Sequence, residues 1–141
     1  MIEIKNRKSN DFNFTEKYVA GLILVGNEIK QIVAKECDLT GSYILINNQP
    51  TLVGSYVKVQ ETKYANNYLA NRDRLILLTK SQIRKLRQET LKGLSIIPIR
   101  LFSNEKGKIK LEFGVGRSLK KFDKRISEKN KEHRKEIYER E

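Results

Sequence analysis

Residues 95–113, SIIPIRLFSNEKGKIKLEF, carry the clearest signal of the fold in this chain. A run rich in Ile, Leu and Phe precedes the polar residues 103–107, and a second run follows from Lys108 to Phe113. The second run alternates apolar and charged residues, which is the period of a half-buried strand. Together the two runs and their glycine-containing turn predict an antiparallel hairpin. Pro98 has no N–H to donate, so we expect it at a sheet edge or a bulge.

Shorter apolar runs precede this hairpin in the chain. Residues 43–46 and 51–53 flank the turn residues 47–50 and predict a second hairpin. The runs 21–26 and 75–78 are typical of short buried strands. Between the two hairpins the sequence predicts one helix, in which Thr79 and Gln82 form a capping box and Gly93 ends the helix just past Leu91. Its apolar stripe is Ile83, Leu86 and Leu91, and its other surface carries Lys80, Arg84, Lys85 and Arg87.

These elements predict a mainly β (α+β) protein. Several short antiparallel strands, a helix between hairpins and a basic surface favour a small OB-type antiparallel β-barrel with one to three short helices. We place this barrel at residues 1–116 and a basic tail at residues 117–141. The tail holds ten Lys/Arg and six Asp/Glu with few large apolar residues, so we expect it to be disordered when free and helical on a partner.

The charge of the chain limits its function. A formal net charge of +12 repels itself and therefore favours a polyanionic partner. Nucleic acid is the commonest polyanion, and a membrane surface comes second. No apolar run approaches the roughly 18 residues of a membrane-spanning helix, and the first five residues do not resemble a signal peptide. With Cys37 as the only cysteine, no internal disulfide can form, which fits the cytoplasm.

No residue pattern typical of catalysis occurs in the chain. The single histidine, His133, lies in the polar tail, and one Cys with one His cannot make a zinc site. Residues 114–117 (GVGR) lack the GK[ST] ending of a phosphate-binding loop. The acidic residues of the body are scattered rather than clustered as in a two-metal nuclease. We therefore expect no enzyme activity, no metal and no cofactor.

Three polar segments are candidates for contact with RNA. Asn6-Arg7-Lys8 is either a solvated loop or a phosphate contact. Glu28 stands beside one base, Lys30, and either forms a surface ion pair or accepts a hydrogen bond from a base amino group or a ribose hydroxyl. Tyr64 and Tyr68, beside Asn66-Asn67, either insert into the core or stack on unpaired bases.

The order and spacing of six motifs resemble one family. They are Asn6-Arg7-Lys8; Ala20-Gly21 followed by Gly26-x-Glu28-Ile29-Lys30; Ser42-Tyr43-Ile44; Arg72-x-Arg74 followed by Leu77-Leu78-x-Lys80; Lys92-Gly93 followed by Ile96-Ile97-Pro98; and Lys120-Lys121-Phe122-Asp123-Lys124-Arg125. The family is small protein B (SmpB), the SsrA-binding protein that partners transfer-messenger RNA (tmRNA). The chain departs from the family pattern at Val19, where a Glu linked to RNA binding is usual, at Leu75 in place of Lys, and at residues 117–119, where the family has Lys-Gly-Lys.

The resemblance implies an RNA-binding role in trans-translation, the rescue of stalled ribosomes. The barrel would bind the tRNA-like domain of tmRNA through Asn6, Arg7, Lys8, Gly26, Glu28, Lys30, Arg72, Arg74 and Lys80. The tail would enter the empty messenger channel near the decoding centre of the small subunit through Lys120, Lys121, Phe122, Asp123, Lys124 and Arg125. Elongation factor Tu and alanyl-tRNA synthetase would be reached through the shared RNA, and the protein would be a cytoplasmic monomer.

The resemblance also sets an expectation for substitutions. Alanine at Glu28 or Arg7 should weaken RNA binding by about 1–3 kcal/mol with little change in thermal stability. The alternative function, a structural ribosome-associated OB-fold protein that binds ribosomal RNA, stays open on the sequence.

Overall fold

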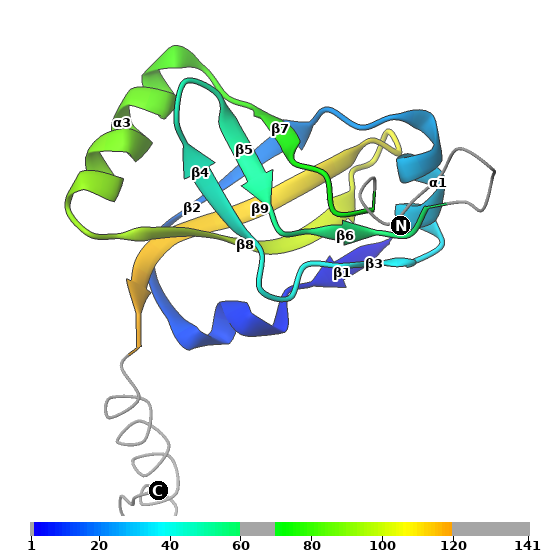
Figure 1. Cartoon of the computed structure of the whole chain (residues 1–141), viewed down its shortest axis with the longest axis horizontal. Coiled ribbons are helices and arrows are strands. Elements are labelled where there is room, and N and C mark those ends of the chain that lie inside the picture. Colours follow the sequence, from blue (N-terminus) through cyan, green and yellow to red (C-terminus); the bar gives the residue numbers. More distant parts are fainter. Residues whose placement is uncertain (1, 60–69, 120–141) are drawn as a thin grey trace, which may run out of the picture.

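The structure, a computed structural model, describes residues 2–59 and 70–119. Seven strands form one antiparallel sheet in the order β1-β8-β9-β2-β7-β5-β4, and β3 pairs with β6 in a separate ribbon (Figure 1). The strands are β1 (Glu3–Lys5), β2 (Phe12–Leu22), β3 (Cys37–Asp38), β4 (Tyr43–Ile46), β5 (Pro50–Val53), β6 (Tyr56–Val57), β7 (Arg74–Leu77), β8 (Ser95–Ser103) and β9 (Ile109–Ser118). The helices are the 3-10 helix η1 (Arg7–Asp11), α1 (Gly26–Val33) and α3 (Lys80–Leu91).

Both expected hairpins are confirmed. β8 and β9 pair from Ser95–Gly116 to Ser103–Ile109, and Ile109, Leu111 and Phe113 are buried as the alternation predicts. The register shifts between Pro98 and Arg100, so Pro98 lies at a bulge, where its missing N–H costs no ladder hydrogen bond. The second hairpin is β4–β5.

The prediction of a buried strand at residues 21–26 is wrong beyond Leu22. β2 ends there, and Ile23 and Val25 are 48% and 55% exposed. The helix α1 then begins at Gly26 because Glu28, its third residue, accepts a hydrogen bond from the backbone N–H of Val25 at 3.0 Å. A glutamate at this position satisfies a donor that the first helical turn leaves unpaired.

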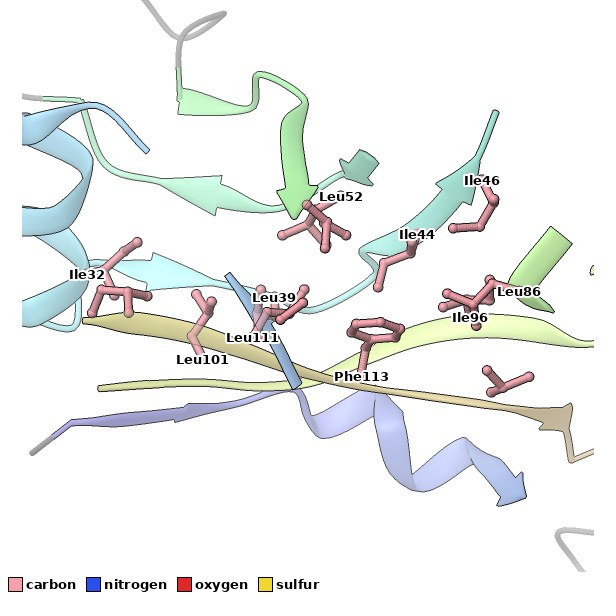
Figure 2. Packing of buried hydrophobic residues seen from close by; sticks show 14 of the residues in the cluster. Ile32, Leu39, Ile44, Ile46, Leu52, Leu86, Ile96, Leu101, Leu111 and Phe113 are labelled. Atoms are coloured by element: carbon pink, nitrogen blue, oxygen red, sulfur yellow. The ribbon is translucent and has the colours of Figure 1, made fainter. Parts of the chain in front are cut away.

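The expected barrel is not closed. Among the described residues the hydrogen-bonded ladder ends at β1 on one side and β4 on the other, and no ladder joins these two strands. The sheet instead curls until β4 packs against β8. Side chains from both halves of the curled sheet fill the space between them, with Phe113, Leu111 and Ile44 near its centre (Figure 2).

The helix α3 has the predicted ends. The Thr79 hydroxyl accepts from the backbone N–H of Gln82 at 3.1 Å, and the Gln82 amide oxygen accepts from the Thr79 N–H at 3.0 Å. Gly93 follows the helix with φ +87, a conformation that favours glycine. Leu86 is fully buried beside Ile96 (Figure 2). Leu91 does not belong to the buried stripe, because it is 83% exposed.

The folded body extends past the expected boundary at residue 116. β9 continues to Ser118, with Arg117 opposite Asn13 and Ser118 opposite Phe12, and the Leu119 N–H donates to the carbonyl oxygen of Asp11. Arg117 and Ser118 therefore belong to β9, and Leu119 is bonded to the residue before β2. The rest of the expected tail, 120–141, lies outside the described residues.

Gly116 is expected to be intolerant of any side chain. A Cβ there would lie 2.2 Å from the backbone oxygen of Asn13, so β2 and β9 would have to separate. Replacing Gly116 by Ala should lower the free energy of unfolding by about 3 kcal/mol. Chemical denaturation would measure this, with Gly26→Ala as the control because a Cβ at Gly26 meets nothing within 4 Å. Equal stability of the two variants would contradict the prediction.

Candidate nucleic-acid interface

Glu28 is the centre of an ion cluster beside α1. Glu28 is 7% exposed, and its carboxylate accepts hydrogen bonds from two arginines that follow it by more than 40 residues. Arg72 donates through Nε to Oε2 at 2.8 Å and through Nη2 to Oε1. Arg74 donates through Nη2 to the same Oε2 at 2.8 Å. One carboxylate thus binds two guanidinium groups, and one of the two pairs is bidentate.

Arg74 connects three segments of the chain. It is 1% exposed, and beyond Glu28 it donates through Nη1 to the hydroxyl of Ser55 at 2.9 Å and to the carbonyl oxygen of Arg72 at 2.9 Å. Its Nη2 also donates to the carbonyl oxygen of Ala70 at 3.2 Å. A buried guanidinium with this many acceptors is structural, because each donor would otherwise lose its water without a replacement.

The charges of the cluster stabilise one another. Burial alone would raise the pKa of the Glu28 carboxyl, but the hydrogen bonds from Arg72 and Val25 and the charges of both arginines outweigh it and hold the pKa below its ordinary value. Burial lowers the pKa of Arg74, and the Glu28 carboxylate opposes this shift. Arg72 is the member that solvent reaches, with 28% of its side chain exposed.

Asn6 is also buried, although the sequence predicts that its side chain contacts RNA. It is 2% exposed, its Nδ2 donates to the carbonyl oxygen of Pro98 at 2.7 Å, and its Oδ1 accepts from the backbone N–H of Lys8 at 3.1 Å. Asn6 therefore caps η1 and fixes it to β8. This leaves Arg7 and Lys8 exposed on η1.

Two hollows lie beside α1. One, of about 330 Å³, has a mainly apolar lining of Val25, Asn27, Glu28, Val57, Lys58, Val59 and Arg72. The other, of about 340 Å³, is lined by Gly21, Leu22, Leu24, Ile29, Leu77, Gly107, Lys108, Ile109 and Lys110. Each hollow thus combines apolar walls with at least one basic side chain, which suits a nucleotide with a flat base and a charged phosphate.

The second hollow opens on the outer face of the sheet. Val19 and Leu77 are 54% and 57% exposed there, and Gly21, paired with Leu77 on β7 and Lys110 on β9, lies between them. A Cβ at Gly21 would lie 3.2 Å from the Leu77 side chain. Glycine here therefore lets a bound group approach the backbone of the sheet closely. Val19 pairs with Glu112 and Gly21 with Lys110, so this face carries apolar and charged side chains together.

The predicted contact residues do not form one site. Glu28, Arg72 and Arg74 meet beside α1, on which Gly26 and Lys30 are exposed. Lys80 is exposed at the start of α3, at a distance from α1 (Figure 1). Tyr64, Tyr68 and Lys120–Arg125 lie outside the described residues. A single sequence does not show that Glu28 forms ion pairs with Arg72 and Arg74. The one hint is that Glu28 is an acidic residue in a chain of mainly basic motifs.

The described part of the chain gives little evidence for a metal site, a membrane-spanning helix or a reactive cysteine. No group of three His, Cys, Asp or Glu side chains could hold a metal ion among residues 2–59 and 70–119. In the same residues no helix is long and apolar enough to cross a membrane. Burial raises the pKa of the half-buried Cys37 thiol to about 11, so it is not a reactive thiolate at neutral pH.

Comparisons with known proteins agree with one another. The family model described as SmpB protein matches residues 3–141. An SsrA-binding protein of Phocaeicola vulgatus is 38% identical over 96% of this chain and 93% of its own length, and one of Mycoplasmopsis pulmonis is 36% identical over 90% and 87%. A solved structure described as "tmRNA-SmpB: a journey to the center of the bacterial ribosome" has a TM-score of 0.67 and 31% identity, covering 97% of this chain and 98% of that one. The chain therefore belongs to the SmpB protein family.

Proposed function

We propose that this protein binds the tRNA-like domain of tmRNA and delivers it to stalled ribosomes in trans-translation. The observation that carries the proposal is the basic, hollowed surface around α1 in a chain whose relatives are SsrA-binding proteins. Arg72 is central to this surface because Glu28 holds its guanidinium in place while part of it stays exposed. An ordered guanidinium binds phosphate or stacks on a base with less loss of entropy than a free one.

The two hollows suggest how an irregular RNA loop is bound. Unpaired bases enter the apolar hollows, while Lys58, Lys108 and Lys110 on their walls meet the phosphates. Glu28 and Arg74 act indirectly, because burial prevents their direct contact with RNA and their hydrogen bonds position Arg72. Arg7, Lys8 and Lys30 are exposed and remain proposed direct contacts.

The finer parts of the proposal concern the ribosome. The segment 120–141 occupies the empty messenger channel near the decoding centre, where its basic residues meet small-subunit RNA. Elongation factor Tu and alanyl-tRNA synthetase act on the same tmRNA and are partners through it. The protein itself works in the cytoplasm as a monomeric binding factor without catalytic turnover. The charge pattern supports the contact with small-subunit RNA, since ten Lys/Arg lie in residues 117–141.

A gel-shift experiment tests the RNA choice. The protein should bind the isolated tRNA-like domain at least about tenfold more tightly than an ordinary tRNA, because shape and unpaired loops distinguish two RNAs of similar charge. Equal affinity for the two RNAs would contradict the proposal. Sequencing the RNA that co-precipitates with the protein distinguishes the proposed function from the alternative one. Bulk ribosomal RNA without tmRNA would indicate a structural ribosome-associated protein.

The affinity for the tRNA-like domain should depend strongly on salt. Of the twelve excess positive charges, eight lie in residues 1–116, so phosphate contacts should dominate the binding energy. The logarithm of the affinity should fall with the logarithm of salt concentration by about 0.7–0.9 for each phosphate neutralised. Filter binding between low and physiological salt measures the slope, and a flat response would mean that charge contributes little.

A further inference from the structure

A third hollow lies at the turn between β8 and β9. It has a volume of about 550 Å³ and is lined by Phe102, the turn residues 103–106, Lys108 and Lys110. The two lysines also line the hollow beside Ile29 of α1, so the two hollows are neighbours on the outer face of the sheet. We call the third one the turn hollow. The proposed function so far gives it no ligand.

One row of residues across the sheet connects the two hollows. Gly21 on β2 is paired with Leu77 on β7 and with Lys110 on β9, and Lys110 is paired in turn with Phe102 on β8. Directly paired residues point to the same face, so Leu77 and Phe102 stand at the two ends of the row on the outer face. With about 4.8 Å between neighbouring strands, three steps from β7 to β8 make the row about 14 Å long. Since stacked bases are about 3.4 Å apart, the row has room for more than one.

The middle of the row carries a positive charge. Gly21 has no side chain, and Nζ of Lys110 lies 3.8 Å from the position that a Cβ on Gly21 would occupy. The ammonium group therefore lies over the backbone of β2, between the two ends of the row. In residues 2–59 and 70–119 no carboxylate forms an ion pair with Lys110. Its charge is thus available to a phosphate.

Phe102 has an ordered ring with an open side. The Arg100 guanidinium covers one face of the ring, with 4.2 Å between its Cζ and the ring centroid. Arg100 is itself held by two carboxylates, because its Nε donates to Oε1 of Glu112 at 2.6 Å and its Nη1 donates to Oε2 of Glu3 at 2.9 Å. The ring is half-buried and lines the turn hollow, so part of it remains open. An aromatic ring that is already ordered loses little entropy when a base stacks on it.

We infer that Phe102 stacks on an unpaired base of the tRNA-like domain, that Lys110 binds the phosphate next to this base, and that a neighbouring base enters the hollow beside α1. The row is thus a base–phosphate–base site. It takes single-stranded RNA, because the bases of a duplex are not free to stack on a side chain. The inference deepens the proposed function and rests on it.

The first test compares two substitutions in the full-length chain. Phe102→Leu removes the aromatic ring, and Phe14→Leu is the matched control because Phe14 is also a half-buried phenylalanine of the sheet. In filter binding with the isolated tRNA-like domain, Phe102→Leu should bind about 10- to 100-fold more weakly than Phe14→Leu, which corresponds to one lost stacking contact. Phe102→Tyr should bind within about threefold of the wild type, because any aromatic ring can stack.

Salt separates stacking from charge. Phe102→Leu should lower the affinity by the same factor at low and at physiological salt, because a stacking contact releases no counterions. Lys110→Gln should instead reduce the slope of log affinity against log salt concentration by about one. A slope of Phe102→Leu reduced as in Lys110→Gln would overturn the inference, because the substitution would then act through the lysines.

A tryptophan at the same position reports stacking directly, because the chain contains no tryptophan of its own. The fluorescence of Phe102→Trp should be quenched when the tRNA-like domain saturates the protein, since a base stacked on an indole quenches its emission. The fluorescence of Phe14→Trp should stay unchanged. Quenching in both variants, or in neither, would overturn the inference.

Two results of the affinity measurements would also overturn it. One is equal affinity of Phe102→Leu and Phe14→Leu. The other is an affinity of Phe102→Tyr as low as that of Phe102→Leu, which would give the ring a structural role only. Failure of the proposed function gives a different result. It appears in the wild type alone, as equal binding of the tRNA-like domain and an ordinary tRNA.

Discussion

Replacing Glu28 by alanine should lower the free energy of unfolding by about 3–5 kcal/mol, because it leaves the buried Arg74 guanidinium without its counter-ion. This expectation replaces the sequence-based one, in which stability would barely change. Arg74 is 1% exposed and donates two hydrogen bonds to the Glu28 carboxylate, and Arg72 donates two more. Urea denaturation followed by circular dichroism measures the loss.

The matched control is Glu36→Gln, since Glu36 follows α1 and is exposed. It should change stability by less than about 0.5 kcal/mol. The double variant Glu28→Met with Arg74→Met should recover part of the loss, because apolar residues of similar size can replace a buried ion pair. A Glu28→Ala variant as stable as the control would show that the cluster does not hold the fold together.

The same cluster makes stability depend on pH. The folded-state pKa of Glu28 lies below its ordinary value of 4.5, so the cluster contributes its full stability above that pH. The contribution should disappear as pH falls through the lower, folded-state pKa. The difference in unfolding free energy between the wild type and Glu28→Gln should therefore shrink as pH falls below 4.5, and a difference independent of pH would contradict this.

Ending the chain after Lys121 should abolish peptide tagging of stalled nascent chains while leaving affinity for the tRNA-like domain within a few-fold. The described body, which ends at Leu119, keeps both hollows and the Glu28 cluster. The removed residues include Lys124 and Arg125, proposed to meet ribosomal RNA phosphates, and Asp123, proposed to accept from a base or fix a turn. Phe122 would stack on an exposed base, worth about 1–3 kcal/mol.

Two measurements separate the outcomes for the truncated protein. A tagging assay on stalled chains reports the ribosomal step, and a gel shift with the tRNA-like domain reports RNA binding. Continued tagging, or loss of RNA binding, would each contradict the assignment of residues 120–141 to the ribosome. The isolated peptide 117–141 should also be mostly unstructured in water by circular dichroism, because its charged composition cannot form a core.

Elements whose signals are local can be predicted from the amino-acid sequence. The alternation at residues 109–113 predicts a half-buried strand, and the capping box of Thr79 and Gln82 marks the start of α3. These predictions hold because strand period and helix caps depend on neighbours a few residues apart. The family resemblance likewise rests on short motifs whose order can be read from the chain, and the comparisons confirm it.

The helix start at Gly26 was missed, although its signal is also local. An apolar run between glycines resembles a strand until the glutamate three residues into the helix is recognised as a partner for the Val25 N–H. Periodicity alone cannot separate a short apolar strand from the segment that leads into a helix.

Which polar side chains are buried depends on contacts between segments far apart in the sequence. Glu28 meets Arg72 and Arg74 across 44 and 46 residues of sequence, and Asn6 meets Pro98 across 92. Such burial results from long-range pairing and packing of segments, as where β1 pairs with β8 and brings Asn6 to Pro98, so no local pattern distinguishes these side chains from exposed contacts. Arg72, by contrast, stays partly exposed in the same cluster, because exposure depends on which segments pack nearby rather than on residue type.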